Sequence, residues 1–190
     1  MLAASLVLLA LSGLAVAGPL EGAEAAYKRG DYATALRLFR PLAEQGNASA
    51  QSSLGFMYEY AQGVPQDYVA AAKWHRLAAQ QGNALSQTRL GFIYQFGNGV
   101  PQNYAEAANW FRRAADQGRA VAQVVLGQMY YSGRGVPKDF VAAYMWLSLA
   151  AAQGDYDAAR TRDQVATFMT DEQISEAQKL AHDWQPKSQR

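Results

Sequence analysis

The pattern of apolar and polar positions repeats every 36 residues between Ala43 and Ala150. Three segments align without a gap, and they span residues 43–78, 79–114 and 115–150. Within each segment, alanines and large apolar residues recur at the three- and four-residue spacing that places side chains on one helix face. This helical spacing occurs twice in each segment, once before and once after a turn that contains glycine and proline. The pattern therefore predicts three copies of a helix–turn–helix unit.

The first helix of each unit carries a leucine, then a glycine, and a tyrosine four residues after the leucine. These residues are Leu54, Gly55 and Tyr58, with equivalents Leu90, Gly91, Tyr94 and Leu126, Gly127, Tyr130. Leucine and tyrosine at this spacing share one face, which we expect to be buried. Glycine in a helix costs about 1 kcal/mol relative to alanine. Its presence in all three copies predicts a neighbouring helix packed too closely for a side chain.

A Gly-Val-Pro turn follows, and it starts at residues 63, 99 and 135. The next helix is expected to begin at an N-cap residue, which is Asp67, Asn103 or Asp139. Each second helix has an alanine and a tryptophan three residues apart, which predicts a tryptophan in the core. These pairs are Ala71 and Trp74, Ala107 and Trp110, and Ala143 and Trp146. Gln-Gly pairs ending at 46, 82, 118 and 154 predict helix ends with a left-handed glycine.

These residues resemble the Sel1-like repeat family, a relative of the tetratricopeptide repeats, over residues 43–150. The family pattern is approximately A-x₂-G-x₃-A-x₃-LG-x₂-Y-x₂-G-x-GV-x₂-D-x₃-A-x₂-W-x₃-A. Ala61, Ser86 and Asn103 depart from it, and none of them is expected to change the fold. The resemblance implies an all-α fold, a right-handed α-solenoid of stacked helix pairs. Stacking is also physically required, because one helix pair cannot bury its apolar face alone.

The segments on either side of the repeats are predicted to cap the stack. Residues 18–42 are expected to form N-terminal capping helices, and residues 151–190 a half-matching repeat followed by a capping helix. Arg162 and Asp163 replace the Leu-Gly pair, which gives this end the polar surface of a cap. Thr170 and Gln173 form a capping-box pattern, which predicts a last helix over 171–184. Asp155 and Asp157 are expected to cap the helix before it.

Residues 1–17 form an uncharged apolar run that ends in Ala15-Val16-Ala17. This ending fits signal peptidase, so we predict a signal peptide cut after Ala17 and a periplasmic or secreted product. The run lacks a preceding lysine or arginine. It is also shorter than the roughly 20 residues that span a bilayer. Two alternatives remain. One is an uncleaved membrane anchor, which is the sole membrane contact we expect, and the other is a buried first helix.

Composition and chemistry narrow the function further. The net charge is +1 and no basic cluster exists, which disfavours nucleic-acid binding. The absence of cysteine excludes disulfides, thiolate metal sites and cysteine nucleophiles. Of the two histidines, His182 has no partner motif, and His75 stands where the other copies have Phe111 and Leu147, which favours packing. The sequence thus predicts no catalytic, cofactor or metal site.

In stacked helical hairpins, the first helices line the concave face, where residues outside the core stripe can meet a partner. Phe56 and Phe92 stand at equivalent positions of adjacent copies, roughly opposite the Leu/Tyr face at 100° per residue. Packing of these rings on the neighbouring repeat is an equal alternative. The predicted partner-binding residues are Ser53, Phe56, Glu59, Arg89, Phe92, Gln95, Gln128 and Tyr131.

Together, these features predict an exported scaffold that binds a protein or peptide partner rather than an enzyme. Scaffolding is also the role that the family resemblance implies. The alternative is a binder of cell-wall ligands or a weak hydrolase of the β-lactamase type. That activity belongs to a cysteine-rich subset of the family, and the chain has no cysteine.

Overall fold

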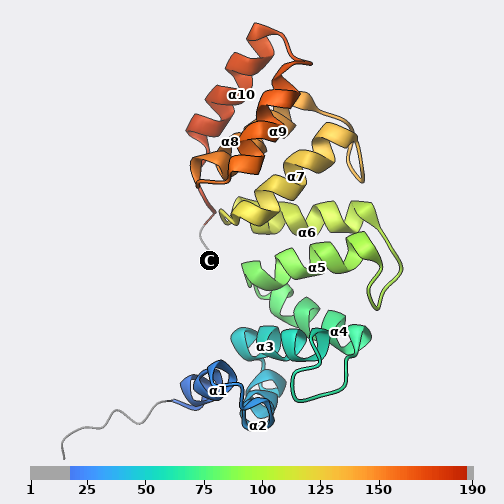
Figure 1. Cartoon of the computed structure of the whole chain (residues 1–190), viewed down its shortest axis with the longest axis vertical. Helices are drawn as coiled ribbons and strands as arrows, with labels where there is room; N and C mark the ends of the chain where they lie inside the picture. The colour runs from blue at the N-terminus through green and yellow to red at the C-terminus, as the bar shows by residue number, and fades with distance from the viewer. Residues whose placement is uncertain (1–17, 188–190) are drawn as a thin grey trace, which may run out of the picture.

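The computed structural model describes residues 18–187, in which every regular element is an α-helix. The helices succeed one another along the long axis of the molecule (Figure 1). Their bounds are α1 Pro19–Lys28, α2 Tyr32–Glu44, α3 Ala48–Glu59, α4 Tyr68–Gln80, α5 Ala84–Phe96, α6 Tyr104–Asp116, α7 Ala120–Ser132, α8 Phe140–Ala152, α9 Tyr156–Ala166 and α10 Asp171–Asp183. The signal peptide predicted over residues 1–17 lies outside the described residues and stays a prediction.

From α1 to α9, each helix packs against the helices before and after it in the chain. We call α3, α5, α7 and α9 the A helices and α2, α4, α6 and α8 the B helices. A helices also contact one another, α3 with α5 and α7 with α9. The result is a stack of helical hairpins, which confirms the predicted all-α solenoid.

In the hairpins α3–α4, α5–α6 and α7–α8, the glycine of the A helix lies directly against a side chain of the B helix. A Cβ atom placed on Gly55 would lie 2.7 Å from the imidazole ring of His75. The same atom on Gly91 or Gly127 would lie 2.7 Å from the Phe111 ring or from Leu147 Cγ. The prediction that these glycines admit a neighbouring helix is confirmed. It also explains His75, which is fully buried in the position that phenylalanine and leucine occupy elsewhere.

The core follows the predicted stripe, with a polar edge. Leu54, Leu90 and Leu126 are at most 1% exposed. The tyrosines four residues later are half-buried, and an arginine of the preceding B helix reaches each of them. Arg40 donates a hydrogen bond to the Tyr58 hydroxyl, Arg76 does the same for Tyr94, and Arg112 lies over the Tyr130 ring. Trp110 and Trp146 are buried as predicted, whereas Trp74 is half-buried.

The predicted helix starts are confirmed. The side chains of Asp67, Asn103, Asp139 and Asp155 accept hydrogen bonds from backbone amides of the first turn. Thr170 and Gln173 form the capping box of α10, although the helix ends one residue earlier than expected, at Asp183. Asp31 caps α2 in the same way, and the hydrogen bonds from Thr34 lower the pKa of its carboxyl group.

The turns connect each hairpin to the one before it. Gly63 has a φ of 73°, and a Cβ there would lie 2.9 Å from Tyr32 Cβ at the start of α2. The equivalent Gly99 and Gly135 lie directly on the backbone of Tyr68 and Tyr104. Each Gly-Val-Pro turn therefore sits on the first residue of the preceding B helix.

Buried glutamines join successive hairpins through a repeated pair of hydrogen bonds, which we call the glutamine ladder. Gln51 Nε2 donates to the Ala43 carbonyl oxygen at 3.0 Å, and Gln51 Oε1 accepts from Gln81 Nε2 at 2.7 Å. The same two bonds recur one and two repeats later. The later glutamine pairs are Gln87 with Gln117 and Gln123 with Gln153.

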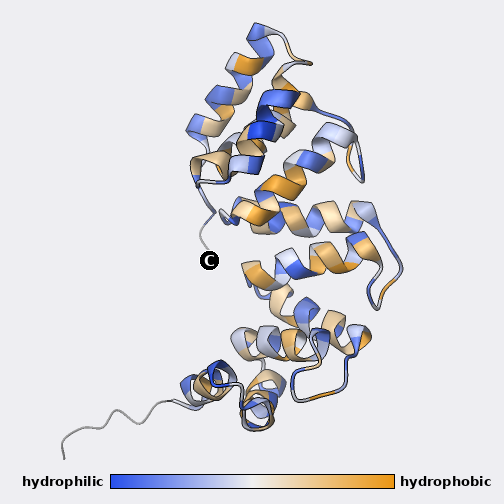
Figure 2. Cartoon of the chain, in the orientation of Figure 1, coloured by the Kyte–Doolittle hydropathy of each residue, from blue (hydrophilic) through white to orange (hydrophobic). Residues whose placement is uncertain are grey.

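The repeat pattern changes at α9. Asp163 occupies the position of the close-contact glycine, so its side chain prevents a B helix from lying against α9 in the usual way. Helix α10 packs on α8 instead, and α9 and α10 carry more hydrophilic residues than α7 (Figure 2). Charge at this end was expected from the sequence; the altered position of α10 was not.

We expect Gly91→Ala to lower the free energy of unfolding by about 1–3 kcal/mol, because the added methyl group overpacks against the Phe111 ring. Gly22→Ala is the matched control, since Gly22 lies within α1 and no atom lies within 4 Å of its added Cβ. It should raise stability by about 0.5–1 kcal/mol through helix propensity. Urea unfolding followed by circular dichroism measures both, and equal effects would contradict the close-contact explanation.

Ala61 has a φ of 55°, whereas Gly97, its equivalent in the next repeat, has a φ of 75°. A left-handed conformation costs a non-glycine residue about 1–2 kcal/mol. We therefore expect Ala61→Gly to raise the unfolding free energy by about 1 kcal/mol and Gly97→Ala to lower it by a similar amount. Thermal and urea unfolding test the pair. Opposite signs support the backbone argument, and a loss in both variants refutes it.

Candidate functional site

Aromatic side chains gather where the A helices end. Tyr60 and Phe96 follow or close α3 and α5 at equivalent positions and are 51% and 61% exposed. Phe168, at the equivalent position after α9, is 57% exposed. Ser132 occupies the equivalent position at the end of α7, so exposed rings recur at three of the four A helices. Exposed apolar side chains that form a contiguous patch are typical of interaction surfaces.

At the end of α3, the rings of Phe56 and Tyr60 contact side chains of both neighbouring helices, α4 and α5. Phe56 stacks on Tyr60 with ring centroids 6.3 Å apart, and it meets the buried His75 edge-on at 4.9 Å. Arg89 of α5 places its guanidinium 5.1 Å from the Phe56 ring centre and 5.2 Å from that of Tyr60. The surfaces of α3 and α5 are thereby continuous.

The second position repeats this arrangement without the arginine. Phe92 stacks on Phe96 at 6.2 Å and meets Phe111 edge-on at 4.9 Å. Beside Phe96, Gln95 of α5 and Gln128 of α7 line a shallow recess. Val125, Met129, Ser132 and Arg134 complete its lining. Because residues of both helices line this recess, the surface continues from α5 to α7.

The far end is a cluster of three rings. Tyr131 of α7 lies 5.9 Å from Phe168 and 6.0 Å from Phe140, and Phe140 stacks on Phe168 at 5.5 Å. We name the whole set the aromatic row. It comprises Phe56, Tyr60, Phe92, Phe96, Tyr131, Phe140 and Phe168.

The structure brings seven of the eight predicted site residues to this surface: Phe56, Glu59, Arg89, Phe92, Gln95, Gln128 and Tyr131. Ser53 is half-buried at the position equivalent to Arg89, and its hydroxyl donates a hydrogen bond to the Ser49 carbonyl oxygen within α3. Phe56 and Phe92 are half-buried: one part of each ring packs on its own hairpin, and another supports an exposed ring. Whether these residues bind a partner stays a prediction.

Sequence reasoning missed the most exposed rings, Tyr60, Phe96 and Phe168. A signal was present, because these residues lie 36 or 72 apart and Tyr60 and Phe96 follow Phe56 and Phe92 by four residues. Glu59 and Gln95, which were among the predicted residues, directly precede Tyr60 and Phe96 at the helix ends.

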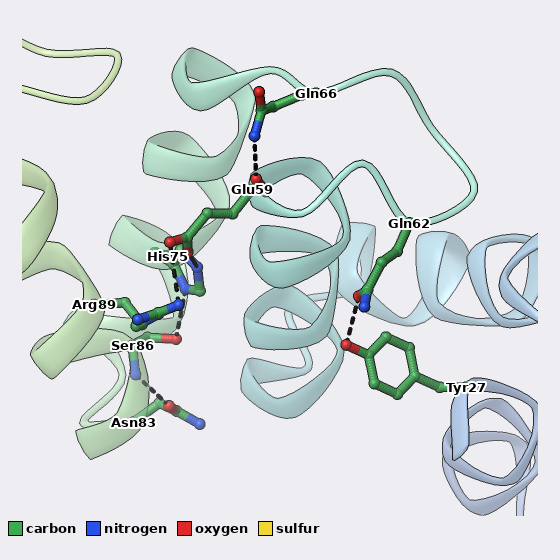
Figure 3. Close-up of polar contacts among 8 residues, drawn as sticks. All are labelled: Tyr27, Glu59, Gln62, Gln66, His75, Asn83, Ser86 and Arg89. Atoms are coloured by element: carbon green, nitrogen blue, oxygen red, sulfur yellow. Dashed lines mark hydrogen bonds and ion pairs between the residues drawn. The ribbon is translucent and has the colours of Figure 1, made fainter. Parts of the chain in front are cut away.

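A chain of polar side chains joins α3, α4 and α5 (Figure 3), and it contacts the row where His75 and Arg89 meet the Phe56 ring. His75 Nδ1 lies 3.2 Å from Ser86 Oγ, and His75 Nε2 lies 3.5 Å from Glu59 Oε2. Glu59 Oε1 in turn pairs with an Arg89 guanidinium nitrogen at 3.1 Å. These four residues, the buried polar chain, connect α3, α4 and α5.

Serine, histidine and a carboxylate are also the parts of a nucleophilic catalyst. Here Ser86 and His75 are fully buried, so the hydroxyl group has no access to a substrate in this conformation. The other interfaces have Phe111 and Leu147 in place of His75, and Ala122 in place of Ser86. The arrangement therefore supports packing of the first two repeats. Within residues 18–187, no group of three or more potential metal ligands lies close together.

None of the described helices has the length and apolar character needed to cross a membrane.

The stacked hairpins, their glycine contacts and the absence of strands among residues 18–187 define a helical repeat protein of the solenoid class. The chain belongs to the Sel1 repeat family, whose sequence profile matches residues 13–47, 48–83, 84–118 and 120–155. The profile thus counts a fourth repeat, residues 13–47, where we expected capping helices. Sel1 repeats generally act as scaffolds for protein–protein interaction.

Solved structures agree with this assignment. The chain is similar to a Sel1 repeat protein from Oxalobacter formigenes, with a TM-score of 0.72 and 29% identity over 83% of this chain and 66% of that one. It is also similar to c5321, a protective antigen of uropathogenic Escherichia coli with an SLR fold, with a TM-score of 0.60 and 29% identity. That match covers 79% of this chain and 40% of the antigen. Comparison with curated proteins gave no significant match.

The buried polar chain can be tested by transplanting the next repeat's residues. We expect His75→Phe alone to lower the unfolding free energy by about 1–3 kcal/mol, because the buried Ser86 hydroxyl loses its imidazole partner and Glu59 keeps only its contact with Arg89. The quadruple variant Glu59→Gln/His75→Phe/Ser86→Ala/Arg89→Val reproduces Gln95, Phe111, Ala122 and Val125. It should return to parental stability within about 1 kcal/mol or exceed it.

Urea unfolding of the parent, the single variant and the quadruple variant measures this recovery. A quadruple variant less stable than His75→Phe would show that the polar chain stabilises the interface beyond what apolar packing provides.

Proposed function

We propose that this chain is an exported scaffold that holds a protein or peptide partner along the aromatic row. The observation that carries the proposal is the recurrence of exposed rings at equivalent positions, Tyr60, Phe96 and Phe168, on a surface continuous from α3 to the end of α9. Aromatic and arginine side chains are the most common energetic anchors of protein interfaces. Here Arg89 lies over two of the rings.

The length of the row favours an extended segment as the partner. Packed helices lie about 8–10 Å apart, so the three intervals between four A helices span roughly 24–30 Å by that spacing. An extended chain rises about 3.3–3.6 Å per residue, so roughly seven to nine residues would cover this distance. The proposed partner therefore presents apolar side chains at intervals along an extended stretch, and Gln95 and Gln128 offer amide groups to its backbone.

Export is part of the proposal and rests on the sequence of residues 1–17, whose apolar run ends in Ala-Val-Ala. A chain without cysteine needs no disulfide chemistry after export. A bacterial periplasm is the compartment we propose, and the two similar structures come from bacteria. The hydrolase alternative gains no support from the described residues, because the one serine–histidine pair that we identify is buried.

The test is a Tyr60→Ser/Phe96→Ser variant, which removes two exposed anchors and leaves the half-buried Phe56 and Phe92 in place. Its control is Val69→Ser, since Val69 is 66% exposed on α4, outside the row. Partners retained from a cell-envelope extract are identified with the parent, and their affinities are then measured. We expect the double variant to bind at least about 10-fold more weakly, as loss of an aromatic anchor commonly does.

Circular dichroism and urea unfolding establish that both variants remain folded. Unchanged affinity in the double variant would show that the partner uses another surface. A retained small molecule or glycan with no protein partner would refute the scaffold function.

A further inference from the structure

The residues after α10 return to a distant part of the stack. Trp184 is half-buried and meets Trp146 of α8 edge-on, with ring centroids 6.3 Å apart and planes at 73°. It packs against the core cluster that contains Phe111, Leu126 and Met129. Trp184 has an extended backbone, with a φ of −68° and a ψ of 136°. Residues 184–187 thus leave α10 without regular secondary structure, and Trp184 is their aromatic anchor.

The end of this segment is fixed at the turn between α6 and α7. The Lys187 amide donates a hydrogen bond to the Asp116 carbonyl oxygen at 2.7 Å. Lys187 Nζ pairs with Asp116 Oδ2 at 2.6 Å. Backbone and side chain of one lysine therefore both contact one aspartate, which lies 71 residues earlier in the chain.

Gly118 forms the floor between these two attachments. A Cβ at Gly118 would lie 3.7 Å from Trp184 and 3.9 Å from Pro186, so the segment passes directly over this glycine. One repeat earlier, the residues equivalent to Asp116, Gly118 and Trp146 are Gln80, Gly82 and Trp110, and one repeat later they are Ala152, Gly154 and His182. An acid, a glycine and a tryptophan therefore occur together at this turn and, with glutamate as the acid, at the turn of Glu44, Gly46 and Trp74, but not at the two adjacent turns.

An aromatic anchor, one backbone hydrogen bond and one charged contact are the means by which grooves hold short peptides. We propose that Asp116, Gly118 and Trp146 form a second peptide-binding site, specific for an extended Trp-x-Pro-Lys segment. The chain's own residues 184–187 fill it in cis as a detachable latch. This site is separate from the aromatic row and does not rest on its function.

The latch is held by one aromatic contact, one backbone hydrogen bond and one ion pair whose lysine side chain is 74% exposed, so we expect it to open without unfolding of the repeats. Trp184 directly follows α10, so the attached segment has a high effective concentration and outcompetes a free peptide. The site is therefore tested in a full-length variant whose own tail is weakened, Trp184→Ser/Lys187→Ser.

The probe is an amidated peptide with the sequence of residues 182–187, His-Asp-Trp-Gln-Pro-Lys, titrated to millimolar concentration. Binding is followed through the NMR amide signals of Asp116 and Gly118. We expect saturable shifts in the weakened-tail variant and at least about 10-fold weaker binding to the parent, where the tail occupies the site. A peptide with serine in place of tryptophan should bind at least about 10-fold more weakly.

Adding Asp116→Asn to the weakened-tail variant provides the matched charge control. It should weaken peptide binding and reduce the dependence on salt, because the charged contact is exposed to screening. If the tail substitutions disturb folding, Lys187→Glu replaces them, since the Lys187 side chain is 74% exposed and the reversed charge opposes Asp116.

Two results would overturn the proposal. Equal peptide affinity for the parent and a folded weakened-tail variant, or none for either, means that the segment does not occupy a ligand site. A concentration-dependent dimer of the parent that Trp184→Ser abolishes means that a second copy supplies the tail, and the cis latch is then wrong.

Discussion

The fold depends on a steric requirement at the centre of the hairpins α3–α4, α5–α6 and α7–α8. One glycine on the A helix must lack a side chain so that one side chain of the B helix can occupy its place. His75, Phe111 and Leu147 differ in size, shape and polarity, yet all three fit against a glycine backbone. The B-helix residue can therefore vary, and the glycine cannot. This contact brings the two helices close enough to bury the leucine stripe and the tryptophans.

The same requirement explains how the C-terminal end differs. Asp163 stands in the glycine position of α9, so α10 cannot close a hairpin there and packs on α8. That displacement directs the end of α10 back along the stack, where Trp184 meets Trp146 and Lys187 meets Asp116. The side chain of Asp163 at a glycine position is thus associated with a different position of α10. That position in turn allows the long-range contact between Lys187 and Asp116.

Periodicity made most of the fold predictable. A glycine conserved in position across three internal copies carries a helix-propensity cost, and its packing role could be inferred from that cost alone. The positions of individual side chains were less predictable at the ends of helices. They were also less predictable where two residues in contact lie far apart in the sequence. The rings of Tyr60 and Phe96 were missed although Glu59 and Gln95, directly before them, were predicted, because an angle of 100° per residue does not decide which of two adjacent residues faces a surface at a helix end. The contact between Lys187 and Asp116 has no periodic counterpart, so no internal comparison could reveal it.

The glutamine ladder also determines how this architecture can change in length. Each buried glutamine pairs with another 30 residues later, and the pattern itself recurs every 36 residues. Duplicating or losing one whole repeat leaves every buried amide paired, because the new neighbours present the same groups. An insertion of any other size within a helix leaves a buried amide without its partner, at a cost of about 1–3 kcal/mol. During evolution, such chains can therefore grow or shrink readily by whole repeats, and recombination within a helix is selected against.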